Sequence, residues 1–131
     1  MKKAVEFLNA NPVQYLATVG RDGKAKCHPF MFAGEPDGKL WFCTNNKKDV
    51  FKDVQKKPEI ELSFSDSAYA QLRLHGTATF ENNLSAKELC MANPIVRAQY
   101  GDAANPIFEV FYLDAPHGTI ADFSGDPPYE F

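Results

Sequence analysis

Two segments in the middle of the chain alternate strictly between apolar and polar residues. Ile60, Leu62 and Phe64 alternate with polar residues in 59–64, and Leu72 and Leu74 open a similar pattern over 71–80. Successive side chains of a strand point to opposite faces, so this period of two predicts strands with one buried and one polar face. Such strands are typical of antiparallel sheets and barrels.

Turn signals divide the rest of the chain into short elements. Three strands are expected at 14–20, 25–33 and 39–44, separated by turns at 21–24 and 35–38. Two last strands are expected at 107–113 and 118–123, around a turn at 114–117, and the tail segment 125–128 is expected to be irregular. Helical segments are expected at 3–9, at 47–57, from a capping box at 85–88 to about residue 93, and briefly up to Tyr100. The order predicts an α+β fold in which about seven short strands close into an antiparallel barrel.

Length and composition exclude several classes of protein. The 131 residues predict a single domain, 1–131, and a net charge of -3 argues against nucleic acid as a partner. Three cysteines without a C-x-x-C spacing indicate reduced thiols rather than a disulfide framework. No segment resembles a signal peptide or a membrane span, so we expect a soluble, cytoplasmic protein.

The segment 44–50 joins a strand to a helix through a polar loop. Asn46 is a candidate N-cap with Asp49 in capping-box position, and Pro58 ends the helix. Free N–H groups at a helix start favour an anion. Thr44, Asn45 and Asn46 add donors, and Lys47 and Lys48 add charge. The segment is interpreted either as a phosphate cradle or as a capped helix with exposed lysines.

A second segment of interest is the strand 26–32, which Pro29 interrupts. Proline lacks the donor for strand pairing, so neighbouring backbone groups are left free for a ligand. These groups suit the polar edge of a flavin ring, while Phe30 or Met31 would pack its apolar edge. The alternative is an edge strand whose aromatic residues belong to the core.

The strand 71–76 carries Gln71 and Arg73 on its polar face, where they contact solvent, a ligand or a partner chain. No histidine spacing indicates a metal site, and none is expected. Cys27 and His28 are neighbours in a strand and point to opposite faces, which argues against a catalytic pair.

In the order of these elements the chain resembles the pyridoxamine 5′-phosphate oxidase-like family of FMN-binding split barrels. The resemblance rests on 15–19 (YLATV) before a D-G turn, 28–32 (HPFMF), 38–45 (GKLWFCTN), the lysines of the helix that ends at Pro58, 59–62 (EIEL) and 71–76 (QLRLHG). The closing 120–125 (IADFSG) is similar to the small general-stress and nitroimidazole-resistance-like branch.

The resemblance implies that FMN lies in a cleft at the interface of a homodimer. The residues implied to bind it are Cys27, His28, Pro29, Phe30, Cys43, Thr44, Asn45, Asn46, Lys47, Lys48, Gln71 and Phe111. Lys48 would hold the phosphate together with Asn46 and Lys47, and Phe111 would line the partner's cleft. Cys27 and His28 stand where the oxidases keep basic residues, which argues against pyridoxine phosphate as substrate.

Three functions follow from these observations. The first is an FMN-dependent oxidoreductase that acts on a small organic molecule, with NAD(P)H as a candidate electron donor. The second is a flavin carrier or sensor without turnover. The third is the same barrel with haem or the deazaflavin F420 as its ligand, in which case His28, His75 or His117 would be the candidate axial ligand.

Overall fold

The two alternating segments form adjacent strands in one antiparallel sheet. In the computed structural model, which describes all of residues 1–131, β4 (Glu59–Ser65) pairs with β5 (Gln71–Phe80), and Leu62 lies directly opposite Leu74. The apolar residues that alternate along both strands are mostly buried, and most polar residues between them are exposed. The predicted strands and the face that each buries are therefore confirmed.

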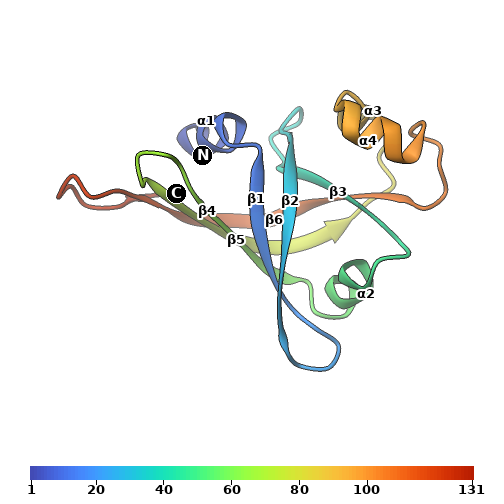
Figure 1. The fold of residues 1–131 in the computed structure, drawn as a ribbon, viewed down its shortest axis with the longest axis horizontal. Coiled ribbons are helices and arrows are strands. Elements are labelled where there is room, and N and C mark those ends of the chain that lie inside the picture. The colour runs from blue at the N-terminus through green and yellow to red at the C-terminus, as the bar shows by residue number, and fades with distance from the viewer.

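The remaining elements surround these two strands (Figure 1). They are α1 (Lys2–Ala10), β1 (Val13–Val19), β2 (Ala25–Gly34), β3 (Trp41–Asn45), α2 (Asp49–Lys56), α3 (Leu84–Met91), α4 (Pro94–Tyr100), β6 (Phe108–Ala121) and β7 (Tyr129–Glu130). The strands pair in the order β3-β2-β1-β4-β5-β6-β7, and β3 also pairs with β6. This last pairing closes six strands into a barrel, so the α+β antiparallel split barrel with short flanking helices is confirmed.

The C-terminal part of the chain differs from the expectation. One long strand, β6, replaces the two strands predicted around a turn at 114–117. Ala115 has a φ of 49°, and the pairing of β6 with β5 shifts register between His75 and Thr77. The residues that favour a turn therefore make a local irregularity in a strand that continues. Residues 125–128 are irregular, as predicted, and they lead into the short strand β7, which was not predicted and pairs with β6 at Thr119 and Ile120.

Buried apolar side chains form two clusters on opposite faces of β3. The larger one fills the barrel, and the smaller one lies outside it, beneath α3 and α4. β3 serves both because its side chains alternate: Phe42 belongs to the barrel core and Trp41 to the outer cluster. The outer cluster thus holds α3 and α4 against the outside of the barrel wall.

The four helices are short, and none is long and apolar enough to cross a membrane. Two of them begin differently from the prediction. The side chain of Asn83 caps α3 by accepting a hydrogen bond from the Ala86 amide at 3.0 Å, so the predicted cap at Ser85 is wrong. Lys48 is the N-cap residue of α2, and no side chain caps that helix, so the predicted Asn46 cap is also wrong.

Candidate functional site

One edge of β2 has no neighbouring strand. β1 pairs with β2 from Ala25 to Met31, whereas β3 pairs with it only at Phe32 and Gly34, where the register shifts. β2 and β3 diverge from there toward α2 (Figure 1). Backbone groups on the free edge lack ladder partners, and Pro29 lacks an N–H altogether. We call this edge of β2 (residues 25–31), together with residues 43–45 of β3 and Lys48, the open seam.

Side chains along the open seam alternate between the outside and the inside of the barrel. Cys27 and Pro29 are exposed, His28 is half-buried, and Phe30 is buried. The Phe30 ring meets the ring of Phe111 edge-on, with 6.0 Å between centroids. The seam therefore offers an apolar inner wall beside unpaired backbone.

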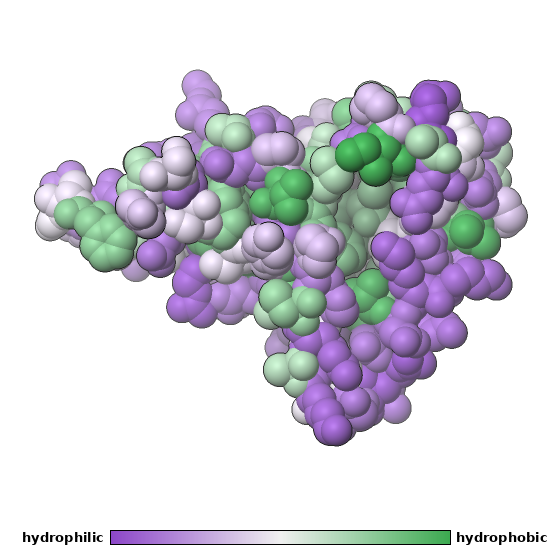
Figure 2. All heavy atoms as spheres, in the orientation of Figure 1, coloured by the Kyte–Doolittle hydropathy of each residue, from purple (hydrophilic) through white to green (hydrophobic).

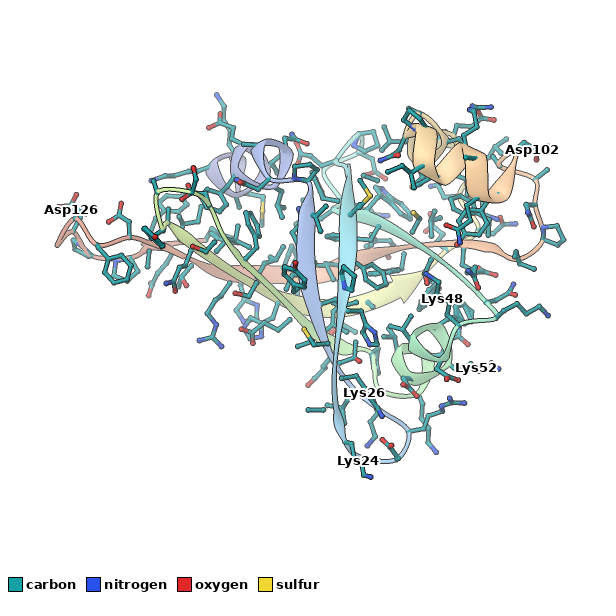
Figure 3. The ribbon with its side chains drawn as sticks, viewed as in Figure 1. Lys24, Lys26, Lys48, Lys52, Asp102 and Asp126 are labelled. Carbon is teal, nitrogen blue, oxygen red and sulfur yellow. The ribbon has the colours of Figure 1, made fainter.

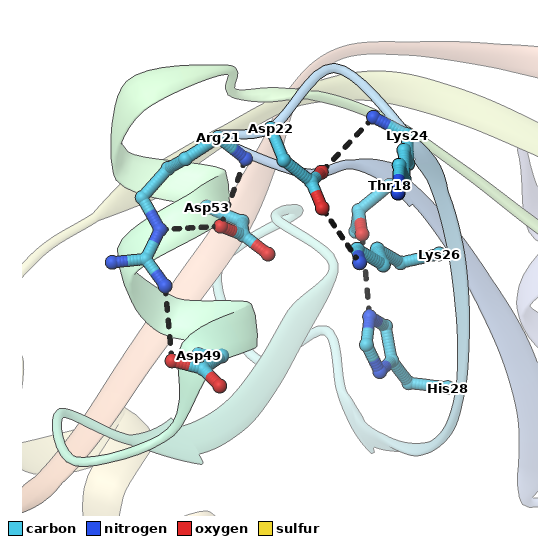
Figure 4. A network of polar contacts seen from close by, with 8 residues as sticks. All are labelled: Thr18, Arg21, Asp22, Lys24, Lys26, His28, Asp49 and Asp53. Atoms are coloured by element: carbon cyan, nitrogen blue, oxygen red, sulfur yellow. Dashed lines mark hydrogen bonds and ion pairs between the residues drawn. The ribbon is translucent and has the colours of Figure 1, made fainter.

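His28 is held on the inner side of the seam by β1. Its Nε2 lies 3.2 Å from the Thr18 hydroxyl oxygen (Figure 4). Burial holds the pKa of His28 below its usual value, and the positive charges of Lys48 and Lys26 lower the pKa further, against the opposing effect of Asp53. The imidazole is therefore neutral at pH 7 and has one donor and one acceptor nitrogen.

Lys48 is the unpaired cation of the seam. It is exposed, forms no ion pair, and its charge acts on both His28 of β2 and Cys43 of β3. It lies between α2 and the strands, whereas Lys52 lies on the outer side of α2 (Figure 3). A cation in this position, next to a helix start that no side chain caps, favours a bound anion.

An ion-pair network fixes α2 beside the β1–β2 hairpin (Figure 4). The Arg21 guanidinium lies 2.6 Å from the carboxylate of Asp53 and 2.9 Å from that of Asp49, and the Arg21 amide donates to Asp53 at 3.0 Å. These hydrogen bonds hold the pKa of Asp53, a buried residue, below its usual value. The network positions Lys48 because Lys48 directly precedes the helix that carries both carboxylates.

Two predicted phosphate ligands have other partners in the structure. Asn45 is buried and donates to the Tyr100 hydroxyl at 2.8 Å, while its oxygen accepts from the Lys47 amide. The side-chain amide of Asn46 donates to the Pro106 carbonyl and to the Glu109 carboxylate. Both side chains hold the loop between β3 and α2 in place.

Thr44 differs from its neighbours because its hydroxyl oxygen is buried and has no hydrogen-bond partner. It is the only buried side-chain nitrogen or oxygen of the chain in this state. A buried hydroxyl without a partner costs free energy, and native structures rarely leave one unless it serves a further contact. The residue lies at the end of β3, within the open seam.

Gln71 and Phe111 do not lie at the seam of their own chain. Gln71 is exposed at the start of β5, three strands from β2 across β1 and β4, or about 14 Å at ordinary strand spacing. Phe111 is 2% exposed and stacks on Phe42 inside the barrel, with ring centroids 5.5 Å apart. Its side chain packs the core of its own barrel, so the expectation that this ring faces a partner's cleft does not agree with the structure.

Sequence reasoning missed the network of Arg21 with α2. The spacing of Asp49 and Asp53, one helical turn apart, places both carboxylates on one face of the helix. That spacing was a usable signal for a basic partner, but the partner lies 28 residues or more away in sequence, at the tip of a hairpin. Only the packing of α2 against β1 reveals it.

Comparisons with known proteins identify the family of this chain and agree with its fold. The sequence matches the pyridoxamine 5′-phosphate oxidase family over residues 1–121, and no curated protein matches it. A NimC/NimA family protein from Clostridium acetobutylicum is 30% identical, with a TM-score of 0.87 over 100% of this chain and 92% of that one.

Two more distant solved structures share the fold. A pyridoxamine 5′-phosphate oxidase-related, FMN-binding protein from Nostoc punctiforme is 19% identical, with a TM-score of 0.71 over 98% of this chain and 85% of that one. A haem-binding protein from Mycobacterium smegmatis is 16% identical, with a TM-score of 0.75 over 94% of this chain and 53% of that one.

Proposed function

Because this chain belongs to the pyridoxamine 5′-phosphate oxidase family, we propose that it is a flavoprotein that binds FMN at the open seam and acts on a small organic molecule. The observation that carries the proposal is the free edge of β2 beside the unpaired cation of Lys48. A phosphate group and a planar heterocycle with polar atoms on one edge fit these two features together.

Different residues of the seam bind different parts of FMN in this proposal. Lys48 neutralises the phosphate, and the exposed Lys47 adds a second charge. Backbone groups of residues 27–30 contact the polar edge of the ring, and the partnerless hydroxyl of Thr44 gains a hydrogen bond. Neutral His28 holds a proton at one ring nitrogen and accepts at the other, so it can orient a ligand atom without adding charge.

FMN supplies the redox chemistry when it is bound, and the protein supplies its position and electrostatic surroundings. The inner wall of Phe30 and Phe42 excludes water from the side of the seam that faces the barrel core. No acid–base pair is needed from the chain for this role. The carrier or sensor without turnover would use the same contacts.

A second copy of the chain completes the site in this proposal. The outer face of β1 exposes three large apolar residues, Val13, Tyr15 and Val19, at 46%, 54% and 42%. Gln71 lies on the same outer face of the sheet, too far from the seam of its own chain to reach it. A homodimer that buries this face would bring Gln71 to the partner's FMN.

The test of FMN binding is an absorption titration of the protein and of two matched variants. Lys48→Ala removes a charged hydrogen bond to phosphate, so its affinity should fall roughly tenfold to a hundredfold. Lys52→Ala removes another exposed lysine, from the outer side of α2, and should bind like the parent. Equal affinity of all three proteins would contradict the placement of the phosphate.

Two further measurements separate the alternatives. Reduction of bound FMN by NAD(P)H, followed by reoxidation with a panel of quinones and nitroaromatic compounds, distinguishes an oxidoreductase from a carrier.

Light scattering tests the dimer: Tyr15→Glu, on the exposed face of β1, should give monomers that have lost FMN affinity. A monomer that still binds FMN as tightly as the parent would rule out the shared site.

Haem is the second candidate ligand, because His28 lies half-buried at the seam with a neutral imidazole. Reconstitution with haem should give a Soret band that His28→Ala removes. Competition between haem and FMN for one site would show which of them binds the seam more tightly.

A further inference from the structure

A groove runs along the outside of the barrel wall, between β2, β3 and the helices α3 and α4. It has a volume of about 290 Å³, and eight of its nine lining residues are apolar. Figure 2 shows the surface hollowed beside β2 and below α3 and α4, with a floor of hydrophobic character. The Asn93 amide lies 3.7 Å from the Met31 sulfur and links α4 to β2 at this groove. The groove is therefore a largely apolar hollow on the outer side of the barrel wall, whereas the proposed FMN site relies on the inner wall and the free backbone of the seam.

Two thiols meet in this groove. Cys43 comes from β3, where its neighbours Phe42 and Thr44 are buried on the opposite face of the strand, so Cys43 points outward. Cys90 comes from α3, one turn after Ala86, on the helix face buried against the barrel wall. Cys43 is half-buried and Cys90 is 3% exposed. Both side chains line this groove and belong to the same apolar cluster, so the two thiols are neighbours where α3 packs on β3.

The environment makes the two thiols unequal. The pKa of Cys43 lies below its usual value, because the neighbouring Cys90 thiol lowers it and the Lys48 charge lowers it further, against the opposing effect of burial. The Cys43 neighbour and burial both raise the pKa of Cys90. The thiolate is the nucleophile in thiol chemistry, so Cys43 is the attacking thiol and Cys90 the second thiol. Such a pair matches the requirements of a reversible redox site.

We propose that Cys43 and Cys90 form a redox-active dithiol that a small hydroperoxide, bound in the groove, oxidises to a disulfide. The Cys43 thiolate attacks one oxygen of the hydroperoxide, the O–O bond breaks, and the leaving oxygen takes a proton to become an alcohol, or water if the oxidant is hydrogen peroxide. Cys43 is then a sulfenic acid. The Cys90 sulfur, losing its proton, attacks the Cys43 sulfur, and the S–O bond breaks to release water. In total two thiols lose two electrons and two protons, and the hydroperoxide is reduced.

This site adjoins the one proposed for FMN, because Met31 and Cys43 belong to both the open seam and the groove, but the reacting side chains lie on the outer side of the barrel wall. The Cys43 side chain lies on the opposite side of β3 from Thr44, and every residue that lines the groove belongs to β2, β3, α3, α4 or the short link between the two helices. The oxidation can therefore be measured whether or not the protein binds flavin, and neither proposal depends on the other.

The first experiment counts thiols in a Cys27→Ser variant, because Cys27 is exposed on β2 and would react independently. Two thiols remain in this variant. Treatment with equimolar hydrogen peroxide should remove both, lower the intact mass by two hydrogen atoms, and give a peptide in which residues 43 and 90 are cross-linked. Dithiothreitol should restore both thiols. Two free thiols after treatment, or a disulfide between two copies of the chain, would overturn the proposal.

A second experiment assigns the roles of the two sulfurs. Cys27→Ser with Cys90→Ser should accumulate a sulfenic acid at residue 43, which dimedone traps. Cys27→Ser with Cys43→Ser should give about tenfold less adduct at residue 90, because the remaining thiol is buried and resists ionisation. Equal labelling, or stronger labelling at residue 90, would contradict the assignment. The first experiment leaves both cysteines intact, so it stands even where a double variant does not fold.

Discussion

The two sides of the barrel are built differently. β5 pairs with β4 at seven positions and with β6 at nine, so both of its edges are hydrogen bonded along most of its length. β2 pairs with β1 at seven positions but with β3 at only two. The closed side buries alternate residues such as Leu72 and Leu74 completely. The closed side therefore holds the fold together, and the open side leaves backbone and side-chain groups free for a ligand.

The largest effect is expected on the closed side. Leu74→Ala removes a fully buried side chain from β5 and should lower the free energy of unfolding by about 3–4 kcal/mol. Met31→Ala, at the half-buried outer face of β2, should cost clearly less. Urea unfolding at pH 7 measures both. Equal losses would show that the two sides contribute alike to stability.

Amide exchange compares the two sides directly. The central amides of β5 lie between two paired strands, whereas alternate amides of β2 at 27–31 face the open seam. Without ligand, the unpaired β2 amides should exchange at least about a hundredfold faster than those of β5. Hydrogen exchange followed by NMR resolves the individual residues. Uniform protection along β2 would mean that another element covers the seam.

The ion pairs that position the open side should make a pH-dependent contribution to the stability of the fold. Asp53→Asn should lower the urea midpoint at pH 7, because it removes the charge that holds Arg21. The pKa of Asp53 is lowered by folding, so its carboxylate stabilises the fold above its ordinary value of 3.8, and this contribution is lost as the pH falls through the lower folded value. The difference between variant and parent should therefore shrink below about pH 4.

A matched control for this effect is Asp126→Asn, at the exposed turn between β6 and β7, far from the hairpin (Figure 3). It should leave the midpoint unchanged at both ends of the pH range. If the urea midpoints of Asp53→Asn and the parent differ by the same amount from pH 7 to pH 3, the charge of Asp53 does not stabilise the fold through this ion pair.

The smallest effect is expected at the tip of the β1–β2 hairpin. Gly23 has a φ of 80°, and a methyl group there would meet no atom within 4 Å. Gly23→Ala should therefore cost only the strain of a left-handed backbone, about 1 kcal/mol. Lys24→Ala, the next residue, should cost nothing measurable. A much larger loss at Gly23 would show that the hairpin carries more of the fold than its exposure suggests.

Alternation of apolar and polar residues in the sequence was sufficient to predict the strands of the closed side. Ile60, Leu62, Leu72 and Leu74 follow a period of two because one face of each strand is buried over its whole length, and this local pattern survives without knowledge of the partners. At 114–117 the same reasoning failed. Asp114 and Pro116 resemble a turn locally, but pairing with β5 keeps β6 extended through the irregularity.

The open side was only partly predictable. Pro29 and the lysines at 47–48 indicated free backbone and positive charge, and the structure places Lys48 within electrostatic reach of β2 and β3. The roles of Asn45 and Asn46 could not be predicted, because their partners Tyr100 and Glu109 are more than 50 residues away in sequence. Likewise the contact of Cys43 with Cys90 depends on how α3 docks on the barrel wall.

The central claim is that the open seam is the FMN site, and hydrogen exchange with and without FMN tests it most directly. We predict that FMN slows exchange in peptides that cover 27–31 and 43–48 and, through a second copy of the chain, at Gln71, while the paired centres of β4 and β5 do not change. Saturable FMN binding that protects the groove beneath α3 and α4, or the β6–β7 hairpin, and leaves β2 unprotected would contradict it.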